Sequence, residues 1–137
     1  KKFLTVRRQP SVLVFLVQKE VAERIARSKK ESILSLSIKA YGTPAYIKTV
    51  PAGAFTPPPS VDSAILAVSH ISRNNFKNAA HEEKFFEAVK KGFGQKRKFL
   101  KNNLGPEYAD ALLREGIGEK ARAEDVALLK WTGLSLP

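Results

Sequence analysis

The sequence of 137 residues contains neither cysteine nor methionine. Without thiols, the chain can form no disulfide bond and no thiolate metal site. Its two histidines, His70 and His81, have no acidic ligand pattern around them, so we expect no bound metal. The longest apolar run, residues 12–17, is much shorter than the roughly 18 residues that cross a membrane, so we expect no membrane partner. The missing methionine and a start without a cap or turn predict a chain that begins inside a longer fold.

Acidic residues are scarce as well. The chain has 24 Lys and Arg residues against 13 Asp and Glu residues, which gives a net charge of +11. Such a surplus favours a polyanionic partner, because Lys and Arg displace the condensed counterions of a phosphate backbone. On charge alone, a generally solvated basic surface is the alternative.

The first half of the chain carries the hydrophobic patterns of an α/β fold. Residues 12–17 form a continuous apolar run, which predicts a strand buried on both faces of a parallel sheet. Apolar side chains at helical spacing follow directly over residues 18–26. Four prolines within residues 51–60 predict a stiff loop. Further strands are expected at residues 34–40, 46–50 and 61–71.

The second half of the chain has helical patterns only. The polar residues 74–81 predict a boundary between two domains, an α/β part at residues 1–73 and a small helical domain at residues 81–137. Helices are expected at residues 82–103, 108–115 and 123–131.

The helix expected over residues 82–103 gives the best physical indication of a partner. Residues 90–101 include six basic side chains and no acidic one. At about 100° per residue, most of these cations fall beside an apolar arc, with Lys96 at the edge of that arc. A solvated helix face is the simpler interpretation. We favour RNA or DNA, because the face lacks acidic partners for stabilising i,i+4 pairs. Gly92 and Gly94, each costing roughly 1 kcal/mol in a helix, predict close packing or a kink.

The proline-rich segment at residues 55–63 is the most distinctive in the chain. Taken alone, such a loop is more often a rigid connector, and a phenylalanine before it more often packs in the hydrophobic core. Several motifs nevertheless occur together: Val17-Gln18-Lys19-Glu20-Val21-Ala22-Glu23-Arg24, the approach from Val50-Pro51 to Phe55, Phe55-Thr56-Pro57-Pro58-Pro59-Ser60-Val61-Asp62-Ser63, Gly92-Phe93-Gly94-Gln95-Lys96-Arg97-Lys98-Phe99-Leu100-Lys101-Asn102-Asn103-Leu104, Gly116-Ile117 and Arg122-Ala123-Glu124. In this order they resemble the ribosomal RNA adenine dimethyltransferases, a family that includes the erythromycin-resistance methylases and mitochondrial transcription factor B. The resemblance covers almost the full chain.

The resemblance implies the C-terminal part of a Rossmann-like methyltransferase sheet, followed by a small all-helical domain that binds ribosomal RNA. The implied methyl donor is S-adenosylmethionine, and the implied substrates are the exocyclic amines of two adjacent adenines in small-subunit ribosomal RNA. Phe55 inherits the role of stacking on the flipped target adenine, while Pro57 and Pro58 hold its ring in position. RNA is expected to contact Lys90, Lys91, Gln95, Lys96, Arg97, Lys98, Lys101 and Asn102. Lys96 and Lys101 stand where the family usually has arginine, which keeps the charge but loses bidentate geometry.

Three elements of the complete enzyme are not found in the sequence: an Asn-Leu-Pro-Tyr-type motif, a glycine-rich loop after a first strand, and an acidic residue that ends a second strand. We therefore expect a C-terminal half that binds no S-adenosylmethionine and transfers no methyl group by itself. The complete enzyme is expected to be a cytoplasmic monomer acting on the small ribosomal subunit. Two alternatives stay open: a non-catalytic RNA- or DNA-binding relative, and a stand-alone basic helical module, which would leave the strand at residues 12–17 without parallel neighbours.

Overall fold

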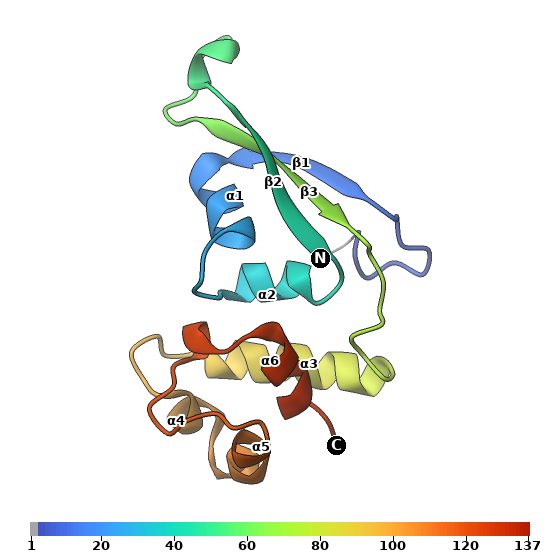
Figure 1. Cartoon of the computed structure of the whole chain (residues 1–137), viewed down its shortest axis with the longest axis vertical. Coiled ribbons are helices and arrows are strands. Elements are labelled where there is room, and N and C mark those ends of the chain that lie inside the picture. Colours follow the sequence, from blue (N-terminus) through green and yellow to red (C-terminus); the bar gives the residue numbers. More distant parts are fainter. Residues whose placement is uncertain (1–2) are drawn as a thin grey trace.

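The computed structural model describes residues 3–137, which form a three-stranded sheet, two helices against it and a layer of helices beneath (Figure 1). The strands are β1 (Leu13–Gln18), β2 (Thr43–Val50) and β3 (Ser63–Ser69). Their order is β1-β3-β2, and β3 is antiparallel to both neighbours. β1 and β2 therefore run in the same direction. Gln18 and Val50 both pair with Ser63, so both strands end beside the proline-rich loop.

Two helices cover one face of this sheet, α1 (Lys19–Ala26) and α2 (Ile33–Lys39) (Figure 1). Alternate residues of β3 are buried on that face, where Ala64 and Leu66 pack with Ala22 and Ile25 of α1. The predicted helix at residues 18–26 and the predicted strands at residues 46–50 and 61–71 are confirmed, although β2 begins three residues earlier, at Thr43, than the prediction.

The prediction that residues 12–17 are buried on both faces of a parallel sheet is wrong. β1 pairs with β3 in the antiparallel direction, and its residues alternate between half-buried and exposed. The side chains of Val14 and Leu16 are 65% and 55% exposed, because among the described residues helices cover only the other face. A continuous apolar run shows that both faces of a strand are apolar. It does not show that other elements of the fold pack against both faces.

The strand predicted at residues 34–40 is also wrong, since this segment is helix α2. Ser32 caps its first turn: the Ser32 hydroxyl accepts from the Ser35 backbone N–H at 3.0 Å, and the Ser35 hydroxyl accepts from the Ser32 N–H at 2.8 Å. Leu36 and Ala40 are fully buried one helical turn apart. These two residues fit a period of two as well as a helical period, so the capping serines decide the conformation.

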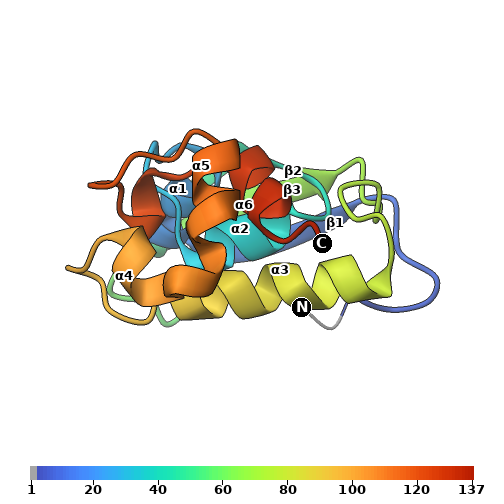
Figure 2. The ribbon, with the colours of Figure 1, turned by 90° about the horizontal axis from the view of Figure 1, so that it is seen from below.

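Every regular element after β3 is helical: α3 (Ala79–Gly92), α4 (Leu100–Leu104), α5 (Ala109–Arg114) and α6 (Leu128–Leu134), with 3₁₀ turns η2 (Pro106–Tyr108) and η3 (Ala123–Asp125). Figure 2 shows α3 lengthwise, with α4 beyond its end. The helix predicted at residues 108–115 is confirmed, and Gly116 follows it with a φ of +63°.

The helix predicted over residues 82–103 is wrong in its length, because α3 ends at Gly92. A Cβ atom at Gly92 would lie 2.5 Å from Cη2 of Trp131 and 2.8 Å from Cδ1 of Leu100, so glycine permits a close approach here. The Asn103 side chain then fixes the turn, donating to the carbonyls of Gly92 at 2.7 Å and Gln95 at 2.9 Å. Close packing and a break in the helix, the two alternatives predicted for Gly92, therefore occur together.

The helix predicted at residues 123–131 is likewise divided, into η3 and α6. Between them Val126 is extended and buried, and its carbonyl accepts a hydrogen bond from the Trp131 indole N–H at 3.0 Å.

One apolar cluster joins the two layers of the molecule. Leu36 and Tyr41 from the layer next to the sheet pack in the same cluster as Phe85 and Trp131 from the helices beneath, and each of the four is at most 2% exposed. Residues on both sides of the predicted boundary at 74–81 thus share a core.

Arg73, in the connection between β3 and α3, links the layers by polar contacts. Its guanidinium donates to the carbonyls of Thr5 at 2.6 Å and Val6 at 3.2 Å, and lies 3.5 Å from the Glu82 carboxylate on α3. The Tyr41 hydroxyl also donates to Glu82. Burial, together with this hydrogen bond, raises the pKa of Tyr41 above its ordinary value.

Candidate nucleic-acid interface

The loop of residues 51–62 lies at the end of the molecule farthest from α4 and α5 (Figure 1). It begins with the 3₁₀ turn η1 (Ala52–Ala54), and Phe55 follows half-buried. Pro57 and Pro58 are exposed. The three residues predicted to handle a target base therefore share one projecting loop, beside the ends of β1 and β2.

Asp62 anchors this loop, a role that the sequence interpretation did not assign. Its carboxylate accepts from the Ala52 N–H at 2.9 Å, and its carbonyl accepts from the Lys19 N–H at 2.9 Å. An acidic residue directly before β3 was the available signal, since aspartate side chains commonly accept from nearby backbone N–H groups in turns. The loop and the first residue of α1 are thereby held together.

All eight residues predicted to contact RNA are exposed near the junction of α3 and α4. Lys90 and Lys91 belong to the last turn of α3, and Lys101 and Asn102 to α4. The remaining four, Gln95, Lys96, Arg97 and Lys98, lie in the turn between these helices. That turn projects sideways beyond the end of α3 (Figure 2). The prediction placed five of the cations on one face of a single helix, namely Lys90, Lys91, Arg97, Lys98 and Lys101, with Lys96 at the edge of the apolar arc. That arrangement is wrong, because α3 ends at Gly92.

Two of these cations have acidic partners that the local sequence does not contain. Lys91 forms an ion pair with Glu107, and Lys101 lies 3.6 Å from the Glu119 carboxylate. The hydrogen bond between Lys91 and Glu107 raises the pKa of Lys91 and lowers the pKa of Glu107. Within residues 3–137 no ion pair involves the other four cations, Lys90, Lys96, Arg97 and Lys98. These four are the group most available to phosphate, and we call them the unpaired cations.

The structure does not bring Phe55 and the unpaired cations together. The loop that carries Phe55 lies at one end of the longest axis, whereas the α3–α4 turn lies at the side of the helical layer, beyond α1 and α2 (Figure 1). An RNA that contacts both must therefore extend along the molecule or fold around it.

Metal and membrane features are absent from the part of the chain that the structure describes. Residues 3–137 contain no group of three or more His, Cys, Asp or Glu side chains placed to hold a metal ion. No helix among them has the length and apolar character needed to cross a bilayer.

Comparison with known proteins decides the family. A sequence model of the family described as "Ribosomal RNA adenine dimethylase" matches residues 1–135. The chain belongs to this family. The resemblance drawn from the motifs is thus confirmed.

Among the relatives of this dimethylase-family chain is "Ribosomal RNA small subunit methyltransferase A" of Dehalococcoides mccartyi strain BAV1, which is 38% identical over 144 residues. That match covers 99% of the chain and 49% of the relative. A protein of the same name from Fusobacterium nucleatum is 39% identical over 127 residues, covering 87% of the chain and 48% of the relative. The chain therefore spans about half the length of the curated relatives it matches.

Solved structures support the fold of the dimethylase-family chain. The dimethyladenosine transferase from Plasmodium falciparum matches with a TM-score of 0.78 and 21% identity, covering 97% of this chain and 59% of that one. The 23S rRNA methyltransferase ErmE matches with a TM-score of 0.73 and 20% identity, covering 97% of this chain and 56% of that one. The predicted α/β class is confirmed by these neighbours.

Proposed function

We propose that this chain is the C-terminal half of a ribosomal RNA adenine dimethyltransferase. Residues 1–73 are the C-terminal part of the catalytic domain, and residues 81–137 are the helical domain that binds ribosomal RNA. The order of the motifs and the family match support this assignment. The observation that carries the RNA-binding role is the group of exposed, unpaired cations at the α3–α4 turn.

The complete enzyme transfers methyl groups to the exocyclic amines of two adjacent adenines in small-subunit ribosomal RNA, and S-adenosylmethionine supplies those groups when bound. We expect the described residues to form no site for this donor. β1 passes directly into α1 through Gln18 and Lys19, without the glycine that lets a strand-to-helix turn approach a nucleotide closely. We therefore propose that residues outside this chain hold the donor. Heat released when S-adenosylmethionine is titrated into this polypeptide alone would contradict the proposal.

Phe55 supplies the surface on which the extruded adenine stacks. A base that leaves its stack loses π contacts, and a ring held by a stiff, anchored loop replaces them at little entropic cost. In the complete protein, Phe55→Ala should lower methyl transfer about 5- to 150-fold, which corresponds to the roughly 1–3 kcal/mol of base–aromatic stacking. Affinity for the unmethylated small subunit should stay nearly unchanged. Phe55→Tyr keeps the aromatic face and should restore most of the activity. An Ala variant as active as wild type would remove Phe55 from the reaction.

The unpaired cations dock the enzyme on RNA phosphates, which positions the substrate without reading its sequence. A non-catalytic RNA- or DNA-binding relative would share this surface. Methyl transfer to unmethylated small subunits by the complete protein separates the two functions, because only the enzyme incorporates label from the methyl donor into RNA.

A further inference from the structure

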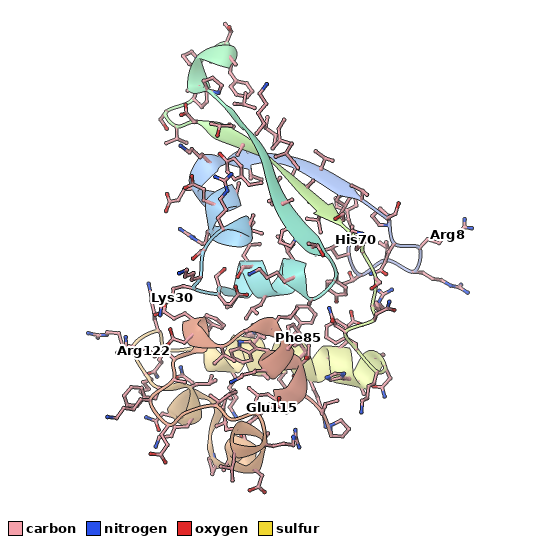
Figure 3. The ribbon with its side chains drawn as sticks, in the orientation of Figure 1. Arg8, Lys30, His70, Phe85, Glu115 and Arg122 are labelled. Carbon is pink, nitrogen blue, oxygen red and sulfur yellow. The ribbon has the colours of Figure 1, made fainter. Side chains whose placement is uncertain are left out.

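The loop that carries Phe55 has little apolar packing to hold it. Phe55 belongs to neither of the two apolar clusters formed among residues 3–137. Residues 56–61 are all exposed, and a Cβ atom placed on Gly53 would meet nothing within 4 Å. Figure 3 shows this loop projecting beyond the sheet, whereas the labelled Phe85 lies in the core between the layers. The position of the Phe55 ring therefore depends on hydrogen bonds more than on packing.

Two hydrogen bonds in series join Asp62 to Phe55. The Asp62 carboxylate accepts from the Ala52 backbone N–H at 2.9 Å. The carbonyl of the same Ala52 accepts from the Phe55 backbone N–H at 3.2 Å, at the end of the 3₁₀ turn η1. Asp62 thus holds the first residue of the turn, and the last hydrogen bond of that turn fixes the backbone at Phe55.

The backbone of Asp62 is fixed independently of its side chain. Its carbonyl accepts from the Lys19 backbone N–H at 2.9 Å, at the first residue of α1. The next residue, Ser63, begins β3, the central strand of the sheet. The carboxylate therefore extends from a rigid part of the fold, and its hydrogen bond to Ala52 restrains the loop.

The acceptor is well suited to this task. The N–H group of the first residue in a helical turn has no partner within the turn, so a side chain has to supply one. A hydrogen bond from a backbone N–H to a carboxylate is about twice as strong as one between neutral groups. Within residues 3–137, no ion pair competes for the Asp62 carboxylate.

We propose that Asp62 is a positioning residue for the target adenine: through Ala52 it holds Phe55 in the conformation that stacks on the extruded base. The inference rests on the stacking role proposed above for Phe55 and extends it to the residue that orients the ring. Orientation matters because an extruded base has to meet a π face that is already in place. In this role Asp62 acts only through Phe55 and does not contact the base.

A double-mutant cycle in the complete protein tests this role. Asp62→Ala should lower kcat for methyl transfer to unmethylated small subunits about tenfold, and by no more than Phe55→Ala does, because one hydrogen bond to a charged group is lost. KM for the subunit should stay nearly unchanged, since the unpaired cations dock the RNA. The double variant Phe55→Ala/Asp62→Ala should transfer methyl groups at the rate of Phe55→Ala alone. Losses that multiply in the double variant would overturn the proposal.

Asp62→Asn is the matched control, because it removes the same charge as Asp62→Ala but keeps an oxygen that can accept from the Ala52 N–H. Its kcat should lie within about threefold of wild type, as the weaker neutral hydrogen bond implies. If the charge of Asp62 acted on RNA phosphates directly, the Asn and Ala variants would behave alike. That result would also overturn the proposal.

Residue-resolved amide hydrogen exchange tests the restraint on the loop without catalysis. In Asp62→Ala, the amides of Ala52 and Phe55 should exchange about tenfold faster than in wild type, while the amides of α3 keep their wild-type rates. Wild-type rates at Ala52 and Phe55 would refute the positioning role, and faster exchange throughout the protein would assign Asp62 to folding instead. Multiplied losses together with an impaired Phe55→Ala variant would refute the positioning role alone. A Phe55→Ala variant as active as wild type would refute the proposed stacking role, and the positioning role with it.

Discussion

Neutralising Arg97 and Lys98 together should flatten the salt dependence of RNA binding. Both side chains are exposed in the α3–α4 turn, and neither has an ion pair within residues 3–137. Each phosphate contact that is lost reduces the slope of log K against log salt by about 0.7 for single-stranded RNA and about 0.9 for a duplex. The double variant to alanine should therefore have a slope that is shallower by about 1.4 to 1.8.

This change in slope has a measurable consequence for affinity. Salt weakens wild type more steeply than the variant, so the advantage of wild type should shrink about tenfold between 50 and 200 mM salt. Fluorescence anisotropy with a labelled small-subunit RNA hairpin, at five salt concentrations, gives both slopes. The variant should unfold at nearly the wild-type temperature, because exposed substitutions typically change stability by less than about 0.5 kcal/mol.

Lys84→Ala is the matched control, since Lys84 is also exposed and lies on α3, in an earlier turn than the predicted RNA contacts. Its slope should equal that of wild type. Lys91→Ala should give an intermediate loss, because Glu107 already neutralises Lys91 in the free protein. Equal slopes for wild type and the double variant would refute the docking assignment, and so would a Lys84 variant that loses as much slope as the double variant.

Three further changes test the packing and the titration of the fold. Gly92→Ala should destabilise the protein by about 1–3 kcal/mol in urea unfolding, because its methyl group meets Trp131; Gly118→Ala, whose Cβ would have no neighbour within 4 Å, is the control and should be nearly neutral. Asn103→Ala should cost about 1–2 kcal/mol in the same assay, since two backbone carbonyls lose their donor. The folded protein raises the pKa of Tyr41 above its ordinary value of 10.0. The contribution of Tyr41 to the free energy of unfolding is therefore complete below pH 10.0. It declines as the pH rises toward the pKa of the folded state, by up to about 1.4 kcal/mol per pH unit. Tyr41→Phe should therefore show a weaker loss of stability between pH 10 and 11 than wild type, and identical profiles would contradict the assignment.

The sequence predicts those elements whose signal is local. α1 is recognisable because its apolar residues recur at helical spacing, and β1 and β3 are recognisable because each is a short, continuous apolar run. α2 is not, because Leu36 and Ala40 fit the periods of a strand and of a helix alike in so short a segment. The exposed faces of Val14 and Leu16 were equally unpredictable, since the pattern of a strand does not show which neighbours cover it.

In the candidate site, the features that the sequence did not predict depend on contacts between residues far apart in the chain. Its residues could be assigned from motifs, but the break after Gly92 depends on Trp131, 39 positions further along the chain. The ion pairs of Lys91 and Lys101 involve Glu107 and Glu119, which lie outside the basic segment.

The shared core of the two layers has a consequence for substrate choice. Because Leu36, Tyr41, Phe85 and Trp131 pack in one cluster, the layer that carries Phe55 and the layer that carries the unpaired cations are held at a constant span. With the roles proposed for these residues, the protein selects an RNA by the distance between its docking element and its target adenine. An RNA whose docking element and target adenine are separated by a different span can satisfy one end or the other, but not both at once. Selection among adenines then depends on distance as much as on base chemistry.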